Sequence, residues 1–316
     1  MDLLPNEFNR VISPKDLIAP PDYVAHWDES VTEEQYHADR TSVGSTQLRK
    51  VLDSPMGFWA SYYGDQEPVA EEDEADHFKV GKMVHMAILE NERFKKTYVI
   101  QPKFWGFTQK GEKTDNLNCK EVKEQIAAWT AALPAEAKVC TEAQLDMITG
   151  IAEAIMKHPQ GPNLIKDCKP EVPGYYRDPE TGILCRIKPD LLKFNGSAMT
   201  DLKTAKSSDE TFFGSQAFNH RYDIQLFMYA EGARLINGTM PELLTSLVIE
   251  KPKPHEPAIF YWQKEDLVQA EIDYRAGLRK LKKCIEENKW PYRQEMIGRI
   301  RTPQWFIYET VNKGIA

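Results

Sequence analysis

Cysteine is scarce in this chain, and no two cysteines stand at the Cys-x-x-Cys spacing of a zinc ribbon. The five cysteines are odd in number and widely scattered: Cys119, Cys140, Cys168, Cys185 and Cys284. Neither a disulfide framework nor a zinc site is indicated, so we expect reduced and mostly buried thiols.

Long apolar runs are also missing. No stretch approaches the roughly 20 residues that a helix needs to cross a bilayer. The first residues, Met1 to Glu7, show no basic region ahead of an apolar stretch, unlike a secretory signal. We therefore expect a cytoplasmic protein without membrane contact. With 316 residues, 41% hydrophobic and 28% charged, the chain can bury a full core.

An excess of basic residues, typical of many nucleic-acid-binding proteins, is absent, since the formal net charge is −8. The excess of negative charge is local, because the segment from Asp65 to Asp76 holds seven acidic residues and no Lys or Arg. Between Arg275 and Arg301, nine basic residues face only three acids. This stretch suits either a phosphate backbone or the solvated face of a helix.

Two predicted strands carry the residues of greatest chemical interest. Ile183, Cys185 and Ile187 alternate with Arg186, Lys188 and Asp190, which predicts a strand with one buried and one solvated face, Asp190 lying on the solvated one. Further along, Asp201 and Lys203 are two residues apart and point to the same side of a strand, while Leu202 points into the core.

Two carboxylates and an ammonium group on neighbouring strands suit metal-assisted phosphodiester hydrolysis. Asp190 and Asp201 would hold Mg²⁺ through hard oxygen ligands, and Lys203 would position water and offset charge on phosphorus. Solvated charges at the ends of two structural strands would give the same pattern, so these residues alone leave both interpretations open.

The rest of the chain predicts an α/β protein. Residues 1–40 read as an irregular arm, and residues 101–118 as an exposed polar loop. Strands are expected at 171–177, 243–250 and 258–263, and helices at 45–63 with a break at Pro55, and at 78–90, 119–133, 142–158, 222–236 and 265–288. An aromatic tail with Pro303, Trp305 and Tyr308 follows.

Four further residues complete the candidate set. His85 flanks the apolar stripe of the helix at 78–90, where a histidine is usually a core or boundary residue. Gly81, one turn earlier, would let a strand approach closely. Glu171 offers a third carboxylate, and Gln225 and Tyr229 share one helix face at i and i+4.

In this order, the motifs resemble the RecB-like branch of the PD-(D/E)xK nucleases, and within it the nuclease domain of RecE-type exonucleases (exonuclease VIII). They are the Leu48, Ser54-Pro55 and Phe58 region, Gly81-x-x-x-His85, Glu171, Pro189-Asp190, Asp201-x-Lys203 and Gln225-x-x-x-Tyr229. The likeness covers about residues 41–308. It implies a mixed central sheet flanked by helices, with residues 41–316 as the nuclease domain and a helical insertion at about 101–168.

The resemblance also implies roles for single residues. His85, Asp190 and Asp201 would bind Mg²⁺ or Mn²⁺, Lys203 would assist the water, and Gln225 and Tyr229 would line the site. Glu171 is the candidate for an additional catalytic carboxylate. Some RecB-like nucleases carry an iron–sulfur cluster on four cysteines, three of them near the C-terminus. Because only Cys284 follows the catalytic core here, we expect no such cluster.

The function implied is exonucleolytic degradation of linear double-stranded DNA from its ends, in the 5′ to 3′ direction, in phage-type recombination or repair. The implied partners are DNA ends, further copies of the chain in a ring, and a single-strand annealing protein. Two alternatives stay open: a RecB-like or CRISPR-associated endonuclease, and a non-catalytic protein that binds DNA ends. The intact set of Asp190, Asp201 and Lys203 argues against the second.

Overall fold

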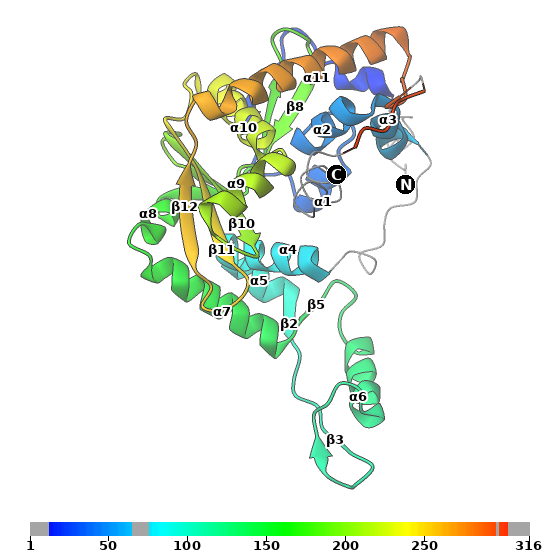
Figure 1. Cartoon of the computed structure of the whole chain (residues 1–316), viewed down its shortest axis with the longest axis vertical. Helices are drawn as coiled ribbons and strands as arrows, with labels where there is room; N and C mark the ends of the chain where they lie inside the picture. The colour runs from blue at the N-terminus through cyan, green and yellow to red at the C-terminus, as the bar shows by residue number, and fades with distance from the viewer. Residues whose placement is uncertain (1–12, 65–75, 295–296, 303–316) are drawn as a thin grey trace, which may run out of the picture.

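A computed structural model describes residues 13–64, 76–294 and 297–302 (Figure 1). The acidic segment at 65–75 and the aromatic residues Pro303, Trp305 and Tyr308 lie outside these ranges. Five strands form the largest sheet; in spatial order they are β12 (Pro257–Tyr261), β11 (Leu243–Glu250), β10 (Ala198–Ala205), β9 (Leu191–Lys193) and β6 (Cys168–Pro170). β10 and β11 are parallel and the other neighbours antiparallel, so the sheet is mixed, as the sequence predicted.

A second, antiparallel sheet contains β1 (His26–Trp27), β7 (Gly174–Arg177) and β8 (Leu184–Ile187). Helix α10 (Tyr222–Asn237) packs on β7 and β8, and its Gln225 also reaches Asp201 on β10. The helix ends at Gly238, whose φ of 81° is the left-handed conformation that glycine adopts without strain. Helix α10 thus contacts strands of both sheets and carries the predicted pair, Gln225 and Tyr229.

The remaining helices include both those that the sequence predicted and others that it did not. They are η2 (Pro14–Leu17), α1 (Glu33–Ala38), α2 (Ser45–Asp53), α3 (Pro55–Tyr63), α4 (Asp76–Leu89), α5 (Asn91–Thr97), α6 (Lys120–Ala131), α7 (Glu142–Lys157), α8 (Gly161–Ile165), α9 (Glu210–Asn219), η4 (Glu265–Leu267) and α11 (Val268–Glu287). The break at Pro55 is confirmed, because Ser54 ends α2 and caps α3 through its hydroxyl. The apolar pattern of the sequence predicted no helix at η2, α1, α5, α8 or α9.

Two hydrophobic clusters cover opposite faces of the large sheet. Met199 and Leu244 join a cluster with α2, α3, α10 and α11, whereas Leu202 and Leu247 pack against α4 and α7. The alternation along β10 therefore separates Leu202 from Asp201 and Lys203, as predicted. Burying side chains of this size stabilises the fold by about 1.5–3 kcal/mol each.

The segment between α5 and α7 extends away from this body. It holds a parallel pair of β2 (Tyr98–Ile100) with β5 (Lys138–Cys140) and a hairpin of β3 (Gly106–Phe107) with β4 (Lys113–Thr114). Figure 1 shows β3 and α6 projecting below the sheet, while α7 lies along the body. The projecting part lies within the helical insertion expected at about 101–168, and the division into domains stays a prediction.

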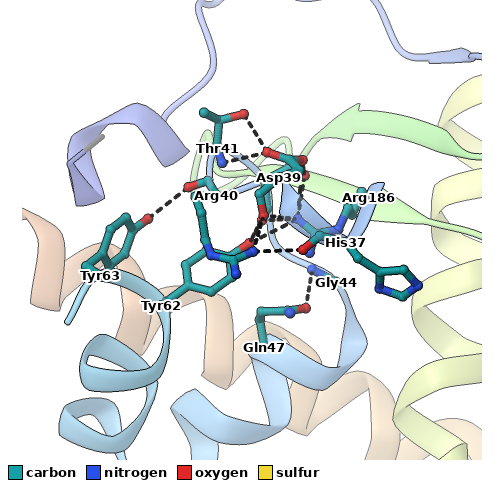
Figure 2. A network of polar contacts seen from close by, with 10 residues as sticks. His37, Asp39, Arg40, Thr41, Gly44, Gln47, Tyr62, Tyr63 and Arg186 are labelled. Atoms are coloured by element: carbon teal, nitrogen blue, oxygen red, sulfur yellow. Dashed lines mark hydrogen bonds and ion pairs between the residues drawn. The ribbon is translucent and has the colours of Figure 1, made fainter. Parts of the chain in front are cut away.

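The N-terminal segment before α2, residues 13–44, is more regular than its sequence indicated. β1 pairs with β7, and α1 begins at a capping box in which Thr32 and Gln35 exchange hydrogen bonds. The segment after α1 covers β8: the Arg186 guanidinium, 3% exposed, donates to the carbonyl of Ser42 at 2.6 Å and to the Tyr62 hydroxyl at 3.0 Å (Figure 2). The prediction of a solvated face on this strand is wrong, because another part of the chain covers it.

None of the helices in the described ranges combines the length and hydrophobicity needed to span a membrane.

Candidate metal and nuclease site

Asp190 lies in the short connection between β8 and β9, directly after Pro189. Its Oδ2 accepts a hydrogen bond of 2.6 Å from the Leu202 backbone N–H, which fixes the carboxylate beside β10. The residue is 7% exposed, so its expected place on a solvated face is wrong. Burial, followed by repulsion from Asp201, raises the pKa of Asp190 well above its usual range.

Asp201 and Lys203 share one side of β10, as their spacing predicted. The Lys203 ammonium lies 2.7 Å from Asp201 Oδ1 and 2.6 Å from Oδ2. Burial opposes the charge on Lys203, but Asp201 and Asp190 outweigh it and raise the lysine pKa. Lys203 is therefore a permanent cation near neutral pH, suited to stabilising negative charge rather than to removing a proton.

Helix α10 contributes the polar pair that faces this strand. Gln225 Nε2 donates to Asp201 Oδ1 at 3.2 Å and to the Tyr229 hydroxyl at 3.0 Å. The i, i+4 spacing puts both side chains on one helix face, as predicted. Asp201 Oδ2 is buried and has no hydrogen-bond donor, although it lies in ionic contact with Lys203. This oxygen therefore keeps lone pairs that a cation could use.

His85 projects from α4 toward Asp190, with 3.7 Å between His85 Nδ1 and Asp190 Oδ2. Burial and the nearby Lys203 lower the pKa of His85, so its imidazole is neutral and able to bind a metal. β10 approaches α4 at Gly81, but a Cβ there would lie 3.7 Å from Thr204 Oγ1, an ordinary contact, so the expected need for glycine is not supported. His85 thus reaches the site without a special requirement for glycine.

Glu171 follows β6 and has a φ of 51°, a left-handed conformation that is unusual for this residue type. It therefore lies in the connection before β7 and not within a strand, where it was expected. Its Oε2 lies 2.7 Å from the Lys188 ammonium. Burial and repulsion from Asp190 raise the pKa of Glu171 to about 7, although Lys188 opposes this shift.

The donor set fits a hard divalent cation. One ligand atom each from His85, Glu171 and Asp190 lies within 4.8 Å of the others. Mg²⁺ holds its ligands at roughly 2.0–2.1 Å, so donors on opposite sides of one ion are separated by about 4 Å, and small side-chain movements suffice here. Two carboxylates with one neutral imidazole suit Mg²⁺ or Mn²⁺.

The grouping differs from the predicted one in a single member. The sequence assigned His85, Asp190 and Asp201 to the metal, whereas the structure gathers His85 and Asp190 with Glu171. Asp201 stands beside Asp190 and is held by Lys203 and Gln225, so its role as a metal ligand stays a prediction.

Sequence reasoning missed Lys188 and Glu33, which both reach this site. The alternation with Ile187 predicts a solvated Lys188, yet its side chain is 11% exposed and contacts Glu171 and Glu33. The Thr32-x-x-Gln35 capping box was the available signal for the helix that carries Glu33.

Comparison with known proteins identifies the family of this chain. A family model described as "PDDEXK-like domain of unknown function (DUF3799)" matches residues 44–303. The chain belongs to this family. The match to the PDDEXK-like family bears out the PD-(D/E)xK part of the resemblance and the α/β fold, while the closer likeness to RecE-type exonucleases stays a prediction. A search of curated proteins finds no match.

Solved structures give a likeness of fold. The chain is similar to a candidate exonuclease from Eubacterium rectale, with 16% sequence identity and a TM-score of 0.57. The similarity covers 90% of this chain and 99% of that one. At such low identity it shows a shared fold over nearly the whole length, and the residues of the site must be judged on their own chemistry.

Proposed function

We propose that this member of the PDDEXK-like family is a metal-dependent exodeoxyribonuclease that degrades linear double-stranded DNA from its ends. One observation carries the proposal: the His85, Glu171 and Asp190 donors lie beside the Asp201–Lys203 pair, with a neutral imidazole and a protonated lysine. This arrangement would place a divalent cation next to a fixed cation, a combination that suits phosphodiester hydrolysis.

The reaction joins a water oxygen to phosphorus and breaks the bond from phosphorus to one ester oxygen. A bound Mg²⁺ or Mn²⁺ would supply Lewis acidity and lower the pKa of coordinated water. His85, Glu171 and Asp190 would hold the ion. Lys203 would donate to a phosphate oxygen or to the attacking water, and so stabilise the charge that develops on phosphorus.

Gln225 and Tyr229 would hold the catalytic side chains in a fixed orientation. Gln225 Nε2 is shared between Asp201 Oδ1 and the Tyr229 hydroxyl, which restrains the Asp201 carboxylate and therefore the lysine bound to it. Holding a catalytic group in one orientation reduces the entropy lost on reaching the transition state.

End dependence, direction and partners rest on the resemblance. A ring of several copies around DNA would keep the enzyme on its substrate even where each contact is weak, as the acidic net charge implies. We propose such a ring, 5′ to 3′ degradation, and cooperation with a single-strand annealing protein. The description of the Eubacterium rectale protein as a candidate exonuclease is in line with this proposal.

The test compares linear, nicked and covalently closed duplex DNA, each with and without Mg²⁺. We expect progressive loss of the linear form with Mg²⁺ only, while closed circles survive. Cleavage of closed circles at the same rate would favour an endonuclease. Binding of DNA ends without any cleavage in Mg²⁺ or Mn²⁺ would favour the non-catalytic alternative.

A further inference from the structure

Lys188 joins two carboxylates from distant parts of the chain. Its ammonium lies 2.7 Å from Glu171 Oε2 and also contacts Glu33 Oε2. The lysine side chain is 11% exposed. A buried ammonium is unfavourable unless carboxylates accept its hydrogen bonds, and here two of them do. The bridge therefore links α1 to the candidate metal ligand Glu171.

The N-terminal segment encloses this bridge. Glu33 begins α1 just after the Thr32 cap, and Tyr36 lies one turn later. Arg186 Cζ and Lys188 Nζ each lie 5.1 Å from the centre of the Tyr36 ring, within the range of cation–π attraction. Because residues 186 and 188 point to the same side of the chain, α1 contacts both cations and limits the movement of Lys188.

Glu171 has room to turn away from the other metal donors. A cavity of about 570 Å³ borders its side chain and is also lined by Glu33, Tyr36 and Lys188. The Asp190 and Glu171 carboxylates each place an oxygen within 4.8 Å of the other, a distance at which like charges repel. Without the Lys188 ammonium on Oε2, Glu171 would gain by rotating into this cavity and away from His85 and Asp190.

We propose that Lys188, held in place by Glu33, is a positioning residue that keeps Glu171 within reach of the divalent ion. The N-terminal segment thereby becomes part of the metal site. Groups that orient metal ligands from outside the coordination shell typically affect metal affinity by about 10–100-fold. The inference rests on the proposed function for its biological meaning, but its effect is measurable by metal binding alone.

The experiment is Mn²⁺ calorimetry on the full chain. Lys188→Met removes the charge while keeping most of the side-chain volume, and we expect Mn²⁺ affinity to fall about 10–100-fold. Lys188→Arg restores a cation and should recover much of the affinity. Glu33→Gln, which leaves Lys188 in contact with Glu171, should weaken affinity in the same direction by a smaller factor.

Glu34→Gln is the matched control, because Glu34 neighbours Glu33 but its side chain is 81% exposed and does not contact Lys188. Its affinity should equal that of the wild type. If Lys188→Met does not fold, as judged by circular dichroism, Glu33→Gln and Lys188→Arg decide the question. Unchanged Mn²⁺ affinity in folded Lys188→Met, or in Glu33→Gln where that variant alone folds, would overturn the proposal. A wild type that binds Mn²⁺ without cleaving DNA would overturn the nuclease function and leave the positioning role intact.

Discussion

Two lysine–carboxylate pairs flank the candidate site, and they differ in what surrounds them. Lys203 and Asp201 share one strand and face the polar side chains of α10. Lys188 reaches Glu171 from a different segment and is enclosed by the N-terminal segment. We propose that the first pair acts on the reacting phosphate, whereas the second orients a metal ligand. Two similar ion pairs can therefore have different roles at one site: one stabilises charge during the reaction, and the other supports metal binding.

The largest effect should come from the first pair. Lys203→Ala removes the cation that stabilises charge on phosphorus, and we expect DNA cleavage at saturating metal to fall by about 100- to 1000-fold or more. Mn²⁺ affinity by calorimetry and duplex binding by fluorescence anisotropy should change little, because the lysine is not a ligand. Cleavage at the wild-type rate would show that Lys203 has no part in the reaction.

Substitution of His85 tests the proposed metal ligands directly. His85→Ala removes one of three donors, so we expect Mn²⁺ affinity to fall by on the order of 100-fold. This loss should be at least as large as the loss caused by Lys188→Met, because Lys188 would not contact the metal itself. Asp146→Asn, a change at an exposed helical carboxylate, is the control and should bind as the wild type does. A variant with lower thermal stability but normal metal affinity would make His85 a structural residue only.

The affinity for Mn²⁺ should also depend on pH. The metal must displace a proton from Glu171, whose pKa is about 7, and from Asp190, whose pKa is also raised. Protonation of His85 at low pH acts in the same direction, so Mn²⁺ affinity should rise by about tenfold or more from pH 6 to pH 8. Calorimetry in buffers of different ionisation enthalpy should detect proton release. Affinity independent of pH would mean that these carboxylates are already ionised.

The smallest effect is expected at Gly81, on the helix that carries His85. A Cβ there would meet only Thr204 Oγ1 at 3.7 Å. Gly81→Ala should therefore stabilise α4 by about 0.5–1 kcal/mol in a denaturant titration, with no change in Mn²⁺ affinity. Destabilisation would indicate that β10 approaches this helix more closely than the structure shows.

The two pairs also differ in how far the sequence reveals them. Asp201 and Lys203 are two residues apart on a strand, and Gln225 and Tyr229 are four apart on a helix, so local periodicity alone places each pair on one face. His85 needed the resemblance, because one histidine beside an apolar stripe has no distinctive spacing.

Lys188 and Glu171 could not be paired from the sequence. Alternation in β8 separates two faces of a strand but does not say whether water or another segment covers the second face. Here the segment that covers it contains α1, a six-residue helix too short to give a periodic signal. Only the capping box at Thr32 and Gln35 indicated that a helix begins there.

The most direct test of the division between the two pairs is the rate of linear DNA cleavage as a function of Mn²⁺ concentration, measured for Lys188→Met and Lys203→Ala. If Lys188 positions a metal ligand, high Mn²⁺ should return the Lys188→Met rate to near the wild-type value. The Lys203→Ala rate should stay at least about 100-fold lower at every concentration, because the missing cation acts on the reacting phosphate. Recovery of Lys203→Ala by metal, or failure of Lys188→Met to recover, would contradict the account.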